Sequence, residues 1–151
     1  MAIAMNLHPD FSEFVQLLNK HDVEYLLVGG YAVVAHGYVR ATGDMDVWIR
    51  PSRSNAAKLI EVLEEFGFGS LGLKVDDFLT RDAIVQLGRP PLRIDLVTSP
   101  EKLSFDDCYG KRVVVEVDKG LTVNVIDLHS LITNKKAVGR AKDLDDLENL
   151  Q

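Results

Sequence analysis

The chain has 151 residues, of which 46% are apolar and 26% charged, a composition typical of a globular domain with a substantial core. Its formal charge of −6 argues against broad, nonspecific binding to nucleic-acid phosphates, although several basic residues cluster near the C-terminus. The single cysteine, Cys108, excludes an intramolecular disulfide and a cysteine-built zinc site, and we expect it to be a small core residue.

Length and hydropathy set expectations for organisation and location. A chain of this length predicts a single domain, residues 1–151, with a C-terminal helical segment from about 127 to 151. No apolar run approaches the roughly 18 residues of a membrane span, and residues 1–9 lack the pattern of a secretion signal. We therefore expect a cytoplasmic protein with no membrane partner.

The first half of the chain alternates helical and extended patterns. Apolar spacing and turn residues predict a helix at 9–20, a short buried strand at 25–28, a small helix at 31–35, a strand at 45–49, and a helix from Ser52 or Ser54 to about Phe66. The glycine-rich stretch 67–72 follows a helix rather than a strand, so we interpret it as a turn and not as a phosphate loop.

The second half is dominated by two hairpin patterns. The pattern predicts a hairpin of 83–87 with 92–97, a short helical turn at 105–109, a hairpin of 112–117 with 121–126, and a helix that starts at Asp127 and ends at Gly139. The segment 75–79 is ambiguous, with a short helix as one interpretation. We predict a further helix after Gly139, with Asp143 and Asp146 as acidic residues near its N-terminus.

Two carboxylates near the middle of the first half indicate a cation site. If the strand at 45–49 begins at Asp44, the side chains of Asp44 and Asp46 point to the same face. At about 4 Å and an effective dielectric near 20, their repulsion is on the order of 4 kcal/mol. A hard divalent cation suits such oxygen ligands. Upstream, Gly29 and Gly30 sit at a strand-to-helix turn, where backbone N–H groups can approach an anion.

Asp95 lies inside an apolar run, between Ile94 and Leu96. A buried lone carboxylate costs several kcal/mol unless it is paired or bound to metal, so we expect Asp95 to join Asp44 and Asp46. The alternative is that it pairs with Arg93 or Arg81. For Arg40, pairing within the protein and contact with a substrate phosphate are both open.

These residues stand in the ordered string GG-x-A-x(3)-HG-x(2)-R-x-T-x-D-x-D, residues 29–46. The string resembles the nucleotidyltransferase superfamily, the fold shared by DNA polymerase beta and the minimal nucleotidyltransferases. Its spacing looks like the branch of small prokaryotic proteins that includes abortive-infection nucleotidyltransferase-like toxins. His36 within it reads as a helix-end histidine with a local hydrogen bond, and the alternative is a ligand or base beside Asp44.

The resemblance implies a fold and a mechanism. The fold is α/β (α+β), a mixed twisted sheet with helices mainly on one face. Asp44 and Asp46 would hold one or two Mg²⁺ ions, with Mn²⁺ as a possible substitute, and Asp95 would join the second ion and take the proton of the acceptor. Binding of the nucleotide would involve the following residues: Gly29, Gly30, Arg40, Thr42, Lys135 and Asp143.

The last two of these residues belong to a second string, N-K-x(3)-G-R-x-K-D-x-x-D at residues 134–146. It resembles the C-terminal motif of the same branch, where a lysine and an aspartate approach the nucleotide. By that resemblance Lys135 neutralises the triphosphate and Asp143 supports the triphosphate or the acceptor, whereas Arg140 and Lys142 are weaker candidates. Solvent exposure is the competing explanation for most of these charges.

Three classes of function follow. The leading class is a metal-dependent nucleotidyltransferase that moves a nucleoside monophosphate from a nucleoside triphosphate to tRNA, another RNA or a protein. Such an enzyme would belong to a toxin–antitoxin or phage-defence system with a cognate partner protein. The second class is an antibiotic nucleotidyltransferase, which usually needs a further acceptor-binding domain. The third class is a non-catalytic module of the same fold that binds nucleotide or a partner.

Overall fold

The structure is a computed structural model that describes residues 7–38, 40–80, 82–89, 92–100, 102–118 and 120–150. Its elements follow one another in the order α1 (Pro9–Lys20), β1 (Tyr25–Val28), α2 (Gly29–Ala35), β2 (Met45–Ile49), α3 (Arg53–Phe66), η1 (Gly69–Leu71), η2 (Val75–Phe78), β3 (Ile84–Arg89), β4 (Leu92–Val97), α4 (Phe105–Gly110), β5 (Val113–Asp118), β6 (Leu121–Val125), α5 (Leu128–Val138) and α6 (Ala141–Leu150). The expected α/β arrangement is confirmed.

Six strands form one mixed sheet in the order β3-β4-β2-β1-β6-β5. The pairs β1–β2, β3–β4 and β5–β6 are antiparallel, whereas β2–β4 and β1–β6 are parallel. Both predicted hairpins are present. The parallel contact between β2 and β4 makes Asp46 and Asp95 neighbours across adjacent strands.

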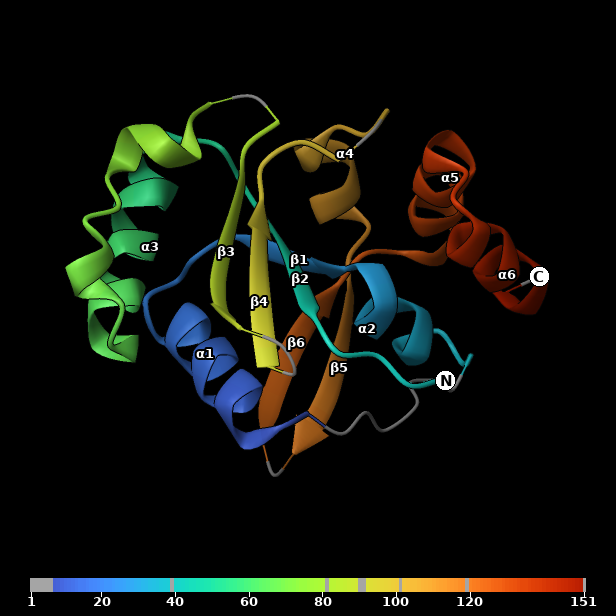
Figure 1. The fold of residues 1–151 in the computed structure, drawn as a ribbon, viewed down its shortest axis with the longest axis horizontal. Helices are drawn as coiled ribbons and strands as arrows, with labels where there is room; N and C mark the ends of the chain where they lie inside the picture. The colour runs from blue at the N-terminus through green and yellow to red at the C-terminus, as the bar shows by residue number, and fades with distance from the viewer. Residues whose placement is uncertain are drawn as a thin grey trace.

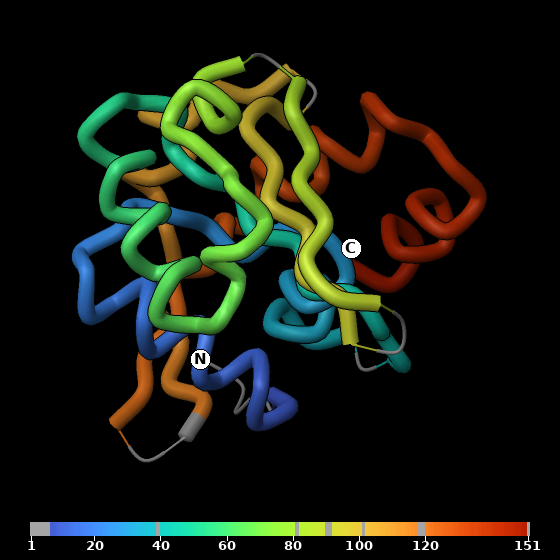
Figure 2. The backbone as a smooth tube through the Cα atoms, turned by 60° about the vertical axis from the view of Figure 1, so that its left-hand side comes forward, coloured from blue at the N-terminus to red at the C-terminus, as the bar shows by residue number. Residues whose placement is uncertain are grey.

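Helices α1 and α3 lie on one side of the sheet, and α5 with α6 lies on the other (Figure 1). The backbone trace in Figure 2 shows the same separation, with the red C-terminal helices away from the green α3 segment. The side under α1 and α3 is tightly packed, since Phe14, Val15, Leu59 and Val62 are fully buried. On the other side, α4 covers one end of the sheet, where Phe105 packs edge-on against Trp48.

Local signals explain most helix boundaries. The Ser52 hydroxyl accepts a hydrogen bond from the Asn55 N–H and caps α3, and Gly67 ends that helix in the left-handed region. Asp127 caps α5 in the same way, and Gly139 ends it. One boundary differs from the prediction, because α2 begins at Gly29 rather than at Tyr31. None of the helices in the described part of the chain combines the length and apolar character needed to cross a membrane.

Candidate active site

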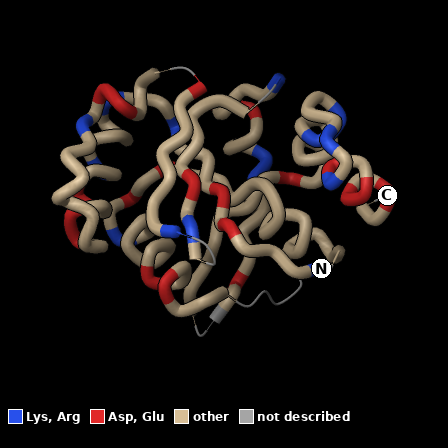
Figure 3. The backbone as a smooth tube through the Cα atoms, in the orientation of Figure 1, with Lys and Arg blue, Asp and Glu red and all other residues tan. Residues whose placement is uncertain are grey.

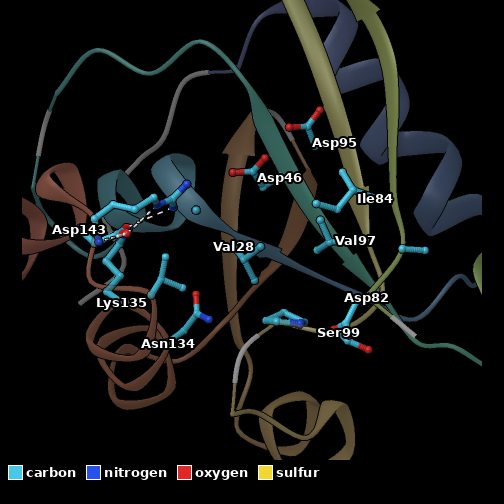
Figure 4. Close-up of a pocket in the computed structure, with 15 residues that line it drawn as sticks. Val28, Asp46, Asp82, Ile84, Asp95, Val97, Ser99, Asn134, Lys135 and Asp143 are labelled. Carbon is cyan, nitrogen blue, oxygen red and sulfur yellow. Dashed lines mark hydrogen bonds and ion pairs between the residues drawn. The ribbon is translucent and has the colours of Figure 1, made fainter. Parts of the chain in front are cut away.

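Asp46 and Asp95 are register partners on the adjacent parallel strands β2 and β4. Side chains of register partners leave a sheet on the same face, and Figure 4 shows both carboxyls pointing into one space. Asp95 is only 8% exposed. Burial, together with the facing charge of Asp95, raises the pKa of Asp46 to about 7. The structure therefore brings these two carboxylates together as the sequence predicts.

Asp44 precedes β2 by one residue, and an arginine links it to Asp95. Arg93 Nη2 lies 2.6 Å from Asp44 Oδ2, and Arg93 Nε lies 2.9 Å from Asp95 Oδ1. The expectation that Asp95 joins the acidic group and the alternative that it pairs with Arg93 thus both hold. Arg81, the other proposed partner, lies outside the described residues.

The sequence analysis did not predict that Arg93 would link Asp44 to Asp95. The contact of Arg93 with Asp95 could be expected from the sequence, because residues two apart in a strand share a face. The contact of Arg93 with Asp44 could not. Among the described residues, no three His, Cys, Asp or Glu side chains are grouped so that they could hold a metal ion. The guanidinium between Asp44 and Asp95 gives the physical reason. The oxygen pair of Asp46 and Asp95 does fit the chemistry of a hard divalent cation.

The two glycines before the site are explained by close packing. A Cβ on Gly29 would lie 2.1 Å from Asp46 Oδ2, and the φ of Gly29 is +66°. A Cβ on Gly30 would lie 2.3 Å from Thr42 Oγ1. The turn therefore needs glycine so that Asp46 and Thr42 can approach the backbone. The predicted contact of Gly29, Gly30 and Thr42 with nucleotide stays a prediction.

Five charged side chains form a cluster that joins α5, α6 and the loop before β2, and we call it the C-terminal ion cluster. Lys135 Nζ lies 3.0 Å from both Asp143 Oδ1 and Asp146 Oδ2. Arg40 Nε donates to Asp146 Oδ1 at 2.8 Å, and Arg140 Nε donates to Asp143 Oδ2 at 2.8 Å. These contacts fasten α6 against α5 and against the segment that leads to Asp44.

The C-terminal ion cluster divides the charges of residues 134–146 into two groups. Solvent exposure explains Lys136, Arg140, Lys142 and Asp145, but not Lys135, Asp143 and Asp146, which are at most 4% exposed. Burial alone would raise the pKa of Asp143, but hydrogen bonds from Arg140 and Lys135 hold that pKa below its usual value.

Of the two possibilities for Arg40, the structure shows the pairing within the protein, and the partner is Asp146.

Two other residues have structural roles. A ring nitrogen of His36, Nε2, lies 2.7 Å from the carbonyl oxygen of Ile126, so His36 ties the end of α2 to the end of β6. This bond is not local, and it leaves the interpretation of His36 as a ligand beside Asp44 without support. Cys108 is buried, as expected of a core residue, and burial raises the pKa of its thiol.

The carboxylates lie in a cleft of about 420 Å³ with two different walls. One wall comes from α5 and the start of α6 and carries Asn134, Lys135, Arg140 and Asp143. The opposite wall comes from β4 and from the chain around the start of β3, and Figure 4 shows Ile84, Val97, Asp82 and Ser99 along it. Figure 3 shows acidic positions in the middle of the sheet and basic ones along α5 and the start of α6.

Residues 6–151 match the model of a family described as "Nucleotidyltransferase of unknown function (DUF6036)". The match covers nearly the whole chain. The chain belongs to the DUF6036 nucleotidyltransferase family. A sequence search of curated proteins finds no match.

Solved structures share the fold of this DUF6036 member at low sequence identity. TM1012 of Thermotoga maritima, described as a candidate nucleotidyltransferase, is 11% identical with a TM-score of 0.61, over 96% of this chain and 94% of its own. The antibiotic-resistance factor ANT(2'')-Ia is 13% identical with a TM-score of 0.59, over 93% and 80%. The lincosamide antibiotic adenylyltransferase LnuA, solved with lincomycin bound, is 16% identical with a TM-score of 0.58, over 97% of both chains.

Replacing Asp146 with Asn should destabilise this DUF6036 protein by about 3 kcal/mol, because loss of one partner from a buried ion pair leaves Lys135 and Arg40 undercompensated. Urea unfolding measures the change. The matched control is Glu148→Gln on the exposed side of α6, which should stay within about 0.5 kcal/mol of the wild type. Equal effects of the two substitutions would contradict a stabilising cluster.

The raised pKa of Asp46 predicts a pH-dependent stability. Between its ordinary value of 3.8 and about 7, folded Asp46 keeps a proton that the unfolded chain releases, so its contribution to stability is lost as pH rises through about 7. Asp46→Asn removes this titration. Without divalent cations, the variant should gain on the order of 2 kcal/mol relative to the wild type between pH 5 and pH 8. A stability difference independent of pH, measured by denaturant unfolding, would contradict the prediction.

Proposed function

We propose that this protein is a metal-dependent nucleotidyltransferase that transfers a nucleoside monophosphate from a nucleoside triphosphate to a hydroxyl acceptor. The observation that carries the proposal is the in-register placement of Asp46 and Asp95 at the floor of a cleft with one basic wall. Membership of a nucleotidyltransferase family supports the chemistry. The raised pKa of Asp46 supports a need for a positive ligand, because at neutral pH the pair lacks full charge compensation.

In the proposed mechanism, Asp46 and Asp95 would hold Mg²⁺, or Mn²⁺ in its place, with Asp44 as a further carboxylate ligand. When bound, the ion offsets the negative charge of the phosphates during an in-line displacement. Asp95 is positioned to accept the proton of the attacking hydroxyl, because its buried carboxylate faces the cleft. The packing of Asp46 against Gly29 fixes the direction of its carboxylate.

We place the triphosphate against the basic wall. Lys135 lines the cleft, but its ammonium is already shared by Asp143 and Asp146. The Arg140 side chain is 59% exposed, and the charge of Lys142 acts on Asp46. On this wall we therefore assign direct phosphate contact to Arg140 and Lys142. Lys135, Arg40 and Asp143 hold that wall in place, while Gly29, Gly30 and Thr42 shape the turn at the nucleotide.

In-line attack puts the acceptor on the side of the α-phosphate opposite to the leaving pyrophosphate, and so against the wall with Ile84 and Val97. The described residues of this wall include Asp82 and Ser99 but no Lys or Arg. A wall of this kind suits a hydroxyl on a protein side chain better than a phosphate-rich tRNA or other RNA. We further propose, from the resemblance of its motifs, that the enzyme acts in a toxin–antitoxin or phage-defence system in the cytoplasm, with a cognate partner protein.

A second candidate is transfer to an antibiotic. LnuA carries lincomycin in a chain that matches the present one over 97% of both lengths. A chain of this size can therefore bind such a molecule, which answers the objection that an antibiotic acceptor needs a further domain. The apolar side chains of Ile84, Val97 and Val138 around the cleft are compatible with this acceptor class.

Asp46→Asn and Asp95→Asn should each lower nucleotide transfer by about 10³-fold, because each removes a carboxylate that would hold the metal ion at the reacting phosphate. Transfer of label from α-³²P-labelled ATP, CTP, GTP or UTP, with Mg²⁺, to protein, RNA and lincosamide acceptors measures the loss. The control Glu148→Gln should retain full activity. Wild-type activity in the Asp46→Asn Asp95→Asn double variant would overturn the mechanism, and calorimetric binding of nucleotide without transfer to any acceptor would favour the non-catalytic module.

The acceptor wall makes a separate prediction. Ile84 is 64% exposed at the mouth of the cleft, so Ile84→Ser should leave the fold intact and raise the KM for the acceptor about tenfold. The KM for the nucleotide should stay unchanged. Leu71→Ser, at an exposed leucine outside the cleft, is the matched control. A rise in the KM for the nucleotide instead would place Ile84 at the nucleotide.

A further inference from the structure

Arg93 links two of the three carboxylates, Asp44 and Asp95. It lies on β4, two residues before Asp95, and its guanidinium makes three short contacts with two carboxylates. Nε donates to Asp95 Oδ1 at 2.9 Å, while Nη2 donates to Asp95 Oδ2 at 3.2 Å and to Asp44 Oδ2 at 2.6 Å. Both oxygens of Asp95 are therefore bonded to a cation that belongs to the chain itself.

This pairing has a direct consequence for any external cation. The guanidinium already takes one lone pair on each oxygen of Asp95, so a divalent ion that binds Asp95 has to share both oxygens with it. The ion would also lie close to a permanent positive charge, since arginine keeps its proton under all ordinary conditions. Hydrogen bonding to Asp95 raises the pKa of Arg93 further. Asp46, by contrast, shows no hydrogen bond to Arg93 among the described contacts.

We propose that Arg93 is a built-in counter-ion that competes with a divalent metal ion for Asp44 and Asp95, and that the phosphates of the incoming nucleotide end this competition by accepting the hydrogen bonds of the guanidinium. This inference rests on the proposed function, because it concerns the same site. Arginine binds phosphate through the same two-pronged geometry that it uses here for a carboxylate. Arg93 thus changes partner rather than losing one.

The proposal makes metal binding depend on nucleotide binding. In the free protein, the metal must displace Arg93 and binds weakly. Once phosphate groups hold Arg93, Asp44 and Asp95 become available, so metal and nucleotide strengthen each other's binding by the same factor. A purely structural Arg93, which only fastens Asp44 to β4, would leave the affinity for metal unchanged apart from the general effect of its charge.

The experiment titrates the metal-free full chain with Mn²⁺ alone and counts free Mn²⁺ by electron paramagnetic resonance. Arg93→Gln removes the positive charge and the paired N–H donors of the guanidinium. Arg93→Lys keeps the charge, but its compact ammonium cannot span both carboxylates in the same way. Arg89→Gln, at an exposed arginine on the neighbouring strand β3, is the matched control for loss of one positive charge. Thermal unfolding of each variant verifies that it folds.

We expect the affinity for Mn²⁺ to rise about tenfold in Arg93→Gln and by a smaller factor in Arg93→Lys, and to stay within about twofold of the wild type in Arg89→Gln. Binding of the Mg²⁺ complex of inorganic tripolyphosphate, measured by calorimetry, should weaken about tenfold in Arg93→Gln. Equal Mn²⁺ affinities of Arg93→Gln and Arg89→Gln, or of Arg93→Lys and the wild type, would overturn the proposal. Should Arg93→Gln fail to fold, the comparison of Arg93→Lys with the wild type decides alone.

These titrations need no nucleotide transfer, so the two proposals can fail separately. The expected Mn²⁺ pattern in a protein that transfers nucleotide to no acceptor would leave the role of Arg93 intact and overturn the proposed function. Active transfer with unchanged Mn²⁺ affinities would support the proposed function and overturn the role of Arg93.

Discussion

The site depends on the cost of holding like charges together. Asp46 and Asp95 come from strands far apart in the sequence, and the parallel pairing of β2 with β4 places them directly opposite each other. Burial removes much of the water that would otherwise screen the two carboxyls. The protein meets this cost in two ways: Asp46 holds its proton up to about pH 7, and Arg93 neutralises Asp95. At neutral pH this compensation is only partial, because Asp46 begins to lose its proton there.

The surrounding structure serves to keep this arrangement in place. The hydrophobic packing of α1 and α3 holds one face of the sheet, while the other face keeps a cleft. The basic wall of that cleft is itself fastened by the C-terminal ion cluster, in which Lys135 is the central cation. Ion pairs of this type contribute little net stability when compared with apolar packing, but they fix geometry. Here they determine where α6 lies relative to the carboxylates.

The sequence allowed the sheet and its carboxylates to be predicted because the relevant signals are local. Apolar alternation marks the strands, and a lone Asp95 between Ile94 and Leu96 requires a partner wherever its strand lies. The contacts of Lys135, Asp143 and Arg40 could not be predicted in the same way. Their spacing is compatible with solvent exposure, and only the docking of α6 against α5 and the loop at Arg40 buries them. The need for glycine at position 29 could not be predicted either, because it depends on the tertiary position of Asp46.

The final helix has a place in the architecture that its position in the chain does not suggest. Asp145 accepts a hydrogen bond from the Tyr38 hydroxyl, and Asp146 accepts one from Arg40. Helix α6 is therefore bonded to the segment that precedes Asp44. Local unwinding of α6 would therefore remove two restraints on this segment at once, although α6 lies about a hundred residues further along the chain.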